Sequence, residues 1–549
     1  MMRSKLWWAG LTLALLGMAC SSVEEAPDPG GTGGTGGTGG EIVQPLSIVS
    51  VSAPDEYTVR IVLSAAPPPE ATELPIYGFA GEGGALEVLA AALDPAANTI
   101  TLTTGKQKLG VGYDLALSRP DSALDGLGAS FLAADTATFW VVDLGSPQFT
   151  QYQVTADRNT IGTHTVIYIE QGMVSSPSDI ATAVDLFDNT TYDTETALFH
   201  AMPDSDGNGR VVLLGLDGKG AYGGYFDPTN TLTDAQAMQQ MGYHSNEMEL
   251  LHINIEWGDF DYWQVIVAHE FQHLLYEEQH PWSNWNYHNE GLAECAVHAV
   301  LGQNDLAMQH YLADPQGGIA AGESLVIWTY ANYDQYVLAY LYWTYIASQL
   351  GGVSAYGDLF DVNGDPSSIQ SFLQASLGKT FAETELAMLI AARVQAATGE
   401  NGFNGMLNVG GTPPVSTASS LNLAPFAGTY IDLGVAVTSV DYPGTQGADI
   451  VYAGITGAGA VDLAAPFDVT NGVLVVLNAK FAPNGSAAEP SGPNLLPVTP
   501  KLAAPLAPSS RRGVVLPNGH DPAWLHPPPF NPSRLDQMRA WQVATQVGR

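Results

Sequence analysis

Cysteine is almost missing from this chain, since Cys20 and Cys295 are the only two in 549 residues. A disulfide framework of the kind that holds small exported domains together is therefore excluded. Basic residues are also few: 18 Lys and Arg stand against 56 Asp and Glu, which gives a formal net charge of −38. This charge argues against a nucleic-acid partner, because binding to phosphates depends on Lys and Arg. Stability must come instead from the burial of large apolar cores.

Long apolar runs are missing too, apart from a short one at the start of the chain. Two basic residues precede an apolar stretch over residues 6–19, which ends at Cys20. This arrangement is typical of a secretory signal, and the run is too short for a membrane span. The end of residues 1–20 resembles a bacterial lipobox, although Gly17 stands where an aliphatic residue is usual. We expect an exported protein, either a cell-envelope lipoprotein anchored by a lipid on Cys20 or, with a plain signal, a secreted one.

Glycine, proline and the spacing of apolar residues divide the rest of the chain. Residues 21–45 repeat Gly-Gly-Thr and predict a flexible linker, while residues 491–549 are Pro-rich and predict a mostly disordered tail. Short alternating runs between turn residues predict a β-sandwich over residues 46–135, which resembles a bacterial immunoglobulin-like module, and a second one over residues 421–490. Residues 136–420 mix strand and helix patterns. The sequence therefore predicts an α+β multidomain protein.

The most informative stretch is an apolar helical run that contains His-Glu-x-x-His. His269 and His273 are four apart, so a helix places both imidazoles on one face, where they can bind one metal ion. Glu270 follows the first histidine and can take a proton from a metal-bound water. This is the zinc-peptidase pattern. The alternative is a pair of structural histidines, but titratable groups in an apolar run cost energy unless they are paired or metal-bound.

A catalytic zinc ion needs a third protein ligand. A further histidine of the H-E-x-x-H-x-x-G-x-x-H type is excluded, because tyrosine and glutamine occupy the last glycine and histidine positions. Glu290 is the best candidate, since the sixteen residues after His273 suffice to end one helix and bring a second alongside. Glu294 lies one turn further on and is expected to accept a hydrogen bond from a ligand histidine. Cys295 lies about 140° around that helix from Glu290, and we interpret it as a buried structural residue.

These residues carry a family resemblance. His269-Glu270-Phe271-Gln272-His273, followed by Asn289-Glu290-Gly291-Leu292-Ala293-Glu294, resembles the gluzincin metallopeptidases, and most closely the hyicolysin-type family of secreted bacterial enzymes. In that group the glutamate of Asn-Glu-Gly is the third zinc ligand. The resemblance is strong over residues 262–300 and fainter over roughly 136–420. It implies a zincin-like catalytic domain, with a mixed sheet above and a helical subdomain below.

The resemblance has two further implications. Similar peptidases bind extended substrate along an edge strand ahead of the motif helix, and the strand expected over residues 249–257 is the one in this position. They also hold the oxyanion with a tyrosine or histidine from the lower half of the domain. Tyr330, Tyr333 and Tyr336 are candidates for this role, and we favour Tyr333. For each of them the alternative is aromatic packing.

A second metal site is suggested by Asp204-Ser205-Asp206-Gly207-Asn208-Gly209. Oxygen-bearing side chains at alternate positions around a glycine bend are typical of calcium loops. A complete twelve-residue loop would end in an acid, but Gly215 occupies that position. Ca²⁺ therefore remains one interpretation, and a polar turn ahead of a strand is the other.

The function expected from these patterns is that of a zinc-dependent endopeptidase acting on protein or peptide substrates, with Zn²⁺ held by His269, His273 and Glu290, and Glu270 as general base. A zinc aminopeptidase is one alternative, but it would need an acidic motif of the G-x-M-E-N type, and none is found. A metal-stabilised adhesion protein without turnover is another. The β modules at both ends allow it, whereas the intact Glu270 argues against it.

Overall fold

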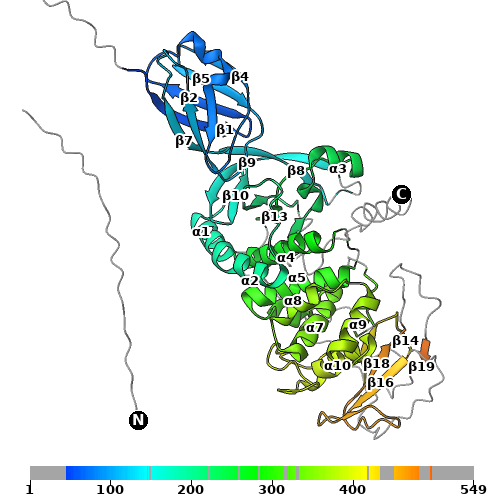
Figure 1. Ribbon diagram of the computed structural model, residues 1–549. Coiled ribbons are helices and arrows are strands. Elements are labelled where there is room, and N and C mark those ends of the chain that lie inside the picture. Colours follow the sequence, from blue (N-terminus) through cyan, green and yellow to red (C-terminus); the bar gives the residue numbers. More distant parts are fainter. Residues whose placement is uncertain are drawn as a thin grey trace, which may run out of the picture. The chain divides into compact units, whose positions relative to one another are not determined.

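The computed structural model describes residues 45–144, 146, 150–219, 223–256, 260–281, 283, 285–313, 319–320, 322–328, 333–416, 420–432, 450–480 and 495–497 (Figure 1). The predicted signal, nearly all of the predicted linker and residues 498–549 lie outside this part. Among the described helices, none combines the length and the apolar character that crossing a membrane requires.

The N-terminal module consists of two antiparallel sheets that enclose one core. One sheet contains, in order, β1 (Ile48–Asp55), β2 (Thr58–Leu63), β5 (Thr99–Thr104) and β4 (Val88–Asp94), and the other contains β3 (Tyr77–Ala80), β6 (Gly112–Leu117) and β7 (Gly128–Leu132). Alternate residues of β2 and β6 point inward, among them Val59, Ile61 and Tyr113, and these pack into the shared core. The strands expected here from the alternating pattern are present.

A six-stranded mixed sheet follows. Its order is β12 (Gly224–Phe226), β13 (Leu250–Asn254), β11 (Val211–Leu216), β10 (Thr165–Glu170), β9 (Gln151–Ile161) and β8 (Thr136–Val142). The central strands β10, β11 and β13 run parallel, and every residue of β11 and β13 is buried. Parallel strands are covered on both faces, which explains their continuous apolar sequences. One face contacts the helices and the other a smaller core that includes Phe139 and Tyr168.

The edge of this sheet lies one strand beyond the position expected from the sequence. The strand ahead of the motif helix is β13, and it lies inside the sheet between β11 and β12. Among the described strands, the antiparallel β12 is at the edge. It lies against the motif helix at Gly224, where an added Cβ would come within 2.2 Å of Ile266 Cγ2. Glycine is therefore needed for this close approach.

Nine helices contribute to the large core on one side of the sheet: α1 (Pro177–Leu186), α2 (Tyr192–Phe199), α4 (Phe260–Gln279), α5 (Asn286–Leu301), α6 (Asp305–Ala313), α7 (Tyr333–Leu350), α8 (Ala355–Phe360), α9 (Pro366–Ser376) and α10 (Phe381–Val394), all within the described residues. The short helix α3 (Asp234–Met241) lies apart from them, near β8 (Figure 1). The helix α5 packs between α4 and α7 (Figure 1). An added Cβ on Gly291 would lie 2.4 Å from Trp343 Cδ1, so this glycine sets the approach of α5 to α7.

The last sheet packs against α10. Its order is β15 (Gly428–Ile431), β18 (Val473–Asn478), β16 (Ile450–Ile455) and β17 (Val461–Asp462), and a separate pair joins β14 (Ser420–Asn422) to β19 (Leu495–Pro497). The hydroxyl of Tyr430 donates to the carbonyl of Leu389 in α10 at 2.6 Å. One face of the four-stranded sheet thus belongs to the helical core, while the other faces a small core of its own. The predicted α+β class with several sheets is confirmed.

Candidate metal centre

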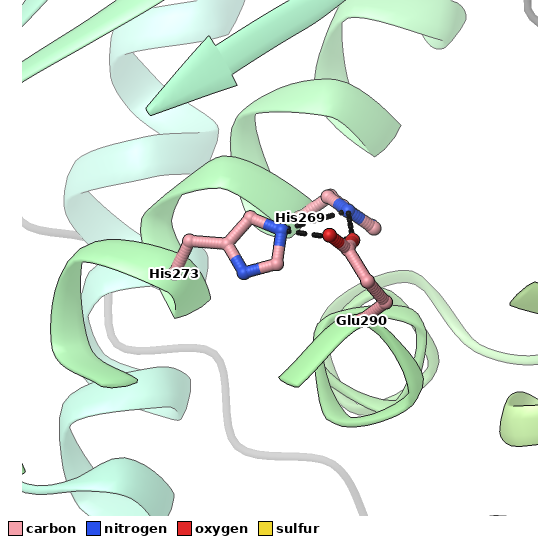
Figure 2. A group of neighbouring side chains, drawn as sticks. All are labelled: His269, His273 and Glu290. Carbon is pink, nitrogen blue, oxygen red and sulfur yellow. Dashed lines mark hydrogen bonds and ion pairs between the residues drawn. The ribbon is translucent and has the colours of Figure 1, made fainter. Parts of the chain in front are cut away.

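Two successive helices bring together three side chains that could hold a metal ion. His269 and His273 lie one turn apart on α4, and Glu290 faces them from the first half of α5 (Figure 2). One nitrogen of each histidine and a carboxylate oxygen of the glutamate all lie within 4.8 Å of one another. Residues seventeen and twenty-one positions apart in the sequence thus meet side by side. The predicted convergence of these three side chains is present.

The distances within this group are short and nearly equal. The Oε2 atom of Glu290 lies 3.2 Å from His269 Nε2 and 3.1 Å from His273 Nε2, and the two Nε2 atoms lie 3.1 Å apart. Ligand atoms at about 2.1 Å from a tetrahedral ion are separated by roughly 3.4 Å. The spacing found here is therefore close to the edge of a tetrahedron around one cation.

The other ring nitrogens of both histidines face acceptors. His273 Nδ1 donates to Asn289 Oδ1 at 2.9 Å, and His269 Nδ1 lies 3.5 Å from Glu294 Oε1. The second oxygen of Glu294 accepts a hydrogen bond from Asn304 Nδ2 at 2.7 Å. These partners favour the proton on Nδ1 in both rings, so that both Nε2 lone pairs point at the centre. Three acceptors then face one another, an arrangement that requires a cation or a proton between them.

The pKa shifts in this group indicate the same requirement for a positive charge at its centre. Burial raises the pKa of Glu290, but the two imidazoles outweigh burial and hold this pKa well below its ordinary range. Burial lowers the pKa of His269, but its bond to Glu290 and two further glutamates outweigh burial and raise this pKa to about 9. The centre thus attracts positive charge, and two imidazoles with one carboxylate form a donor set that suits a divalent ion such as zinc.

Glu270 is buried beside this group, with 7% of its surface exposed. Its Oε2 accepts a hydrogen bond from the backbone N–H of Phe226, in the edge strand β12, at 2.9 Å. Burial raises the pKa of Glu270, and the two histidines partly offset this effect. A buried carboxylate with a raised pKa, next in sequence to a histidine of this group, is suited to accept and return a proton.

The three tyrosines considered for an oxyanion role differ in their surroundings. Tyr333, at the start of α7, is buried, and its ring contacts that of His310 edge-on at 5.0 Å between centroids. The ring of Tyr336 lies 6.3 Å from that of His269. Tyr330 lies outside the described residues. The role favoured for Tyr333 stays a prediction, and Tyr336 is the one whose ring lies near a histidine of the centre.

Cys295 is fully buried on α5 and lies 3.7 Å from the Thr344 hydroxyl. Burial raises the pKa of its thiol, which disfavours the thiolate that a metal would need. This agrees with its interpretation as a structural residue.

A second group that could hold a metal ion contains Asp204, Asp206 and Glu249, and one carboxylate oxygen from each lies within 4.8 Å of the others. The sequence indicated the two aspartates but not the glutamate, which is more than forty residues away. Asn289 and the backbone of Phe226 were likewise missed, because neither a backbone donor nor a single amide has a sequence signature.

Comparisons with known proteins add little. No protein-family model matches the chain, and no curated protein matches it. Among solved structures, one of the S-layer protein rSbsC matches with a TM-score of 0.16 and 15% identity, over 18% of this chain and 16% of that one. The N-terminal part of the bacterial S-layer protein SbsC matches with a TM-score of 0.17 and 12% identity, over 23% of this chain and 36% of that one. These matches cover well under half of either S-layer chain, and scores this low carry no argument about fold or function.

Proposed function

We propose that this protein is a zinc-dependent endopeptidase with a zincin-like catalytic domain of the gluzincin type, similar to the hyicolysin-type family. One observation carries the proposal. His269, His273 and Glu290 converge within 3.2 Å of one another, next to a buried glutamate that is held by the backbone of an edge strand. A purely structural metal site would have no need for a carboxylate like Glu270 beside it.

The three converging side chains would hold Zn²⁺ and leave one coordination position open. A bound zinc ion would lower the pKa of a water molecule and polarise the scissile carbonyl. Glu270 would take the proton of this water and pass it to the leaving amine. Asn289 and Glu294 would keep the two imidazoles oriented through their Nδ1 atoms.

The substrate is proposed to be an extended segment of a protein or peptide. Its backbone would pair with β12, the edge strand that lies next to Glu270. This pairing uses backbone atoms and accepts many sequences, which favours an endopeptidase over an aminopeptidase. Tyr333 or Tyr336 would donate to the oxyanion.

The place of action is also a proposal. The N-terminal pattern ending at Cys20 supports export, either to the cell envelope as a lipoprotein or into the medium. The sheet module ahead of the catalytic part would hold it away from the membrane.

Glu270→Gln is the most direct test. This change keeps the shape of the side chain and removes its ability to accept a proton, so we expect kcat on a protein substrate to fall by about 10²–10⁴-fold. Zinc content should stay near one ion per chain. Glu278→Gln is the matched control, because Glu278 is exposed on the same helix. Its activity should equal that of the wild type.

Unchanged proteolysis by Glu270→Gln would remove the catalytic role of this residue. Wild-type protein that binds zinc but cleaves no member of a mixed peptide library would instead support a non-catalytic metal site. Cleavage confined to peptides with a free N-terminal amine would support an aminopeptidase.

A further inference from the structure

We propose that Asp204, Asp206 and Glu249 form a binding site for Ca²⁺ that fastens the loop before β11 to the start of β13. The site is separate from the group on α4 and α5, and it does not depend on the proposed peptidase activity. Two of its acids come from the loop, and the third comes from a residue more than forty positions later in the chain.

The geometry suits calcium. Calcium takes oxygen ligands at about 2.4 Å, so oxygens on opposite sides of one ion lie roughly 5 Å apart. Ligand oxygens of the three acids lie within 4.8 Å of one another, and the group contains neither nitrogen nor sulfur ligands. Magnesium demands a stricter octahedral arrangement. Glu249 also replaces the acid that the loop lacks at Gly215, where a complete calcium loop would end.

The second observation is an unpartnered buried oxygen. Glu249 has no exposed surface, and its Oε1 accepts from the backbone N–H of Ser205 at 2.8 Å. Its Oε2 is buried without a hydrogen-bond partner. A buried carboxylate oxygen without a partner costs free energy, and a cation at this point would remove the cost.

Hydrogen bonds within the loop hold the carboxylates of Asp204 and Asp206 close to Glu249. Asp206 accepts from the backbone N–H and the side-chain amide of Asn208 at 3.0 and 2.9 Å, and Asp204 accepts from the N–H of Gly209 at 2.9 Å. Gly207 has a φ of +71°, a left-handed turn that glycine adopts without strain. The loop is thus held in a bend that gathers its carboxylates toward Glu249.

The charge balance of this site favours a cation. Burial raises the pKa of Asp206 to about 7, and the charges of Glu249 and Asp204 add to the effect. One nearby cation, the amine of Lys108, donates to the carbonyl of Gly207 at 3.0 Å and lowers the pKa of Asp206 only in part. One positive charge does not balance three carboxylates, so the net charge of the site favours a divalent cation.

Calcium binding at this site would hold two neighbouring strands together. The loop leads directly into β11, Glu249 directly precedes β13, and the backbone N–H of Val212 already bonds to the carbonyl of Glu249 at 2.8 Å. An ion here would fix two neighbouring parallel strands at the same end. Because β13 pairs with the edge strand β12, calcium would stabilise the sheet on which the proposed substrate lies.

The test uses the full chain, stripped of metals and reloaded with zinc alone. Calcium chloride is titrated in a calorimeter, and thermal unfolding is followed with and without calcium, with magnesium chloride in parallel. We expect one calcium ion per chain and a rise in melting temperature that magnesium reproduces only weakly. The absence of heat and of any melting shift up to about 10 mM calcium, well above the range of extracellular calcium modules, would overturn the proposal.

Two variants locate the site. Asp204→Asn and Glu249→Gln should each weaken calcium binding by at least about tenfold, because both remove a charged ligand. Glu195→Gln is the matched control, since both oxygens of Glu195 are buried without a partner but no acid joins it in a metal-binding group among the described residues. It should keep the full calcium response.

Glu249→Gln also separates ion binding from a structural role. Its Oε1 can still accept from Ser205, and it removes a buried unpaired charge. Without calcium the variant should therefore be at least as stable as the wild type, and with calcium it should be less stable. Equal destabilisation in both conditions would make Glu249 a structural residue and overturn the proposal. Calcium binding retained by His269→Ala would show that the two metal sites are separate.

Discussion

The two groups of residues proposed to bind metal ions differ in what positions them. The group on α4 and α5 lies between long helices that are packed into the largest core, and an acceptor oxygen lies behind each imidazole, from Asn289 for His273 and from Glu294 for His269. The group at Asp204 is built on a turn and on the residue before a strand. The first holds mixed nitrogen and oxygen donors and the second holds oxygen alone. The comparison teaches that helix packing can fix a site for a demanding ion, while a loop suits an ion that tolerates irregular geometry.

The largest expected effect comes from His269→Ala. Removing one of three ligands should reduce bound zinc from one ion per chain to nearly none, and proteolysis should fall to background. Metal analysis of the dialysed protein measures the first effect, and a casein assay the second. Undiminished zinc in this variant would contradict the proposed ligand set.

A smaller effect is expected from Glu294→Gln, which touches the ion only through His269. The amide keeps an acceptor near His269 Nδ1 but loses the negative charge that makes the imidazole more basic. Zinc affinity should fall by about 10–100-fold, as measured by competition with a chromogenic chelator. Calcium-dependent melting should not change. If Glu294→Gln altered both ions equally, the two groups would not be the separate sites described above.

The smallest expected effect tests helix packing directly. In Gly291→Ala the new methyl group would overlap Trp343, and α5 would move away from α7 at a cost of about 1–3 kcal/mol. The free energy of unfolding in urea measures this cost. Because Glu290 adjoins the altered residue, zinc binding should weaken while calcium binding stays.

Ala293→Gly, two residues further along the same helix, is a control for the general cost of changing the backbone here. A stability of Gly291→Ala equal to that of the wild type would show that α5 is not held by this contact.

Much of the candidate metal centre could be predicted, because its chemistry follows the helical repeat. Their spacing alone places His269 and His273 on one face of a helix. Glu290 could be predicted because the residues between it and His273 suffice to end one helix, form a turn and begin a second helix. The described geometry agrees with both inferences. The position of Glu294 beside His269 followed from the same repeat, since it lies one turn beyond Glu290.

Other features could not be predicted, for physical reasons. Glu249 joins Asp206 through the pairing of β11 and β13, and this pairing of distant segments has no local pattern. The edge strand β12 has only three residues, too few to show an alternation, so β13 took its place in the sequence interpretation. The contact of α10 with the last sheet was missed as well, because apolar strands do not reveal which surface covers them.

The bond between Phe226 and Glu270 has a consequence for how the protein tolerates change. The donor is a main-chain amide, so nineteen of the twenty amino acids at position 226 supply the same N–H, and proline alone removes it. The residue proposed as general base is therefore supported by a contact that ordinary mutation at its partner cannot erase. Fraying of the short strand can still disturb this contact. The reactivity of Glu270 would therefore depend on how well β12 is ordered.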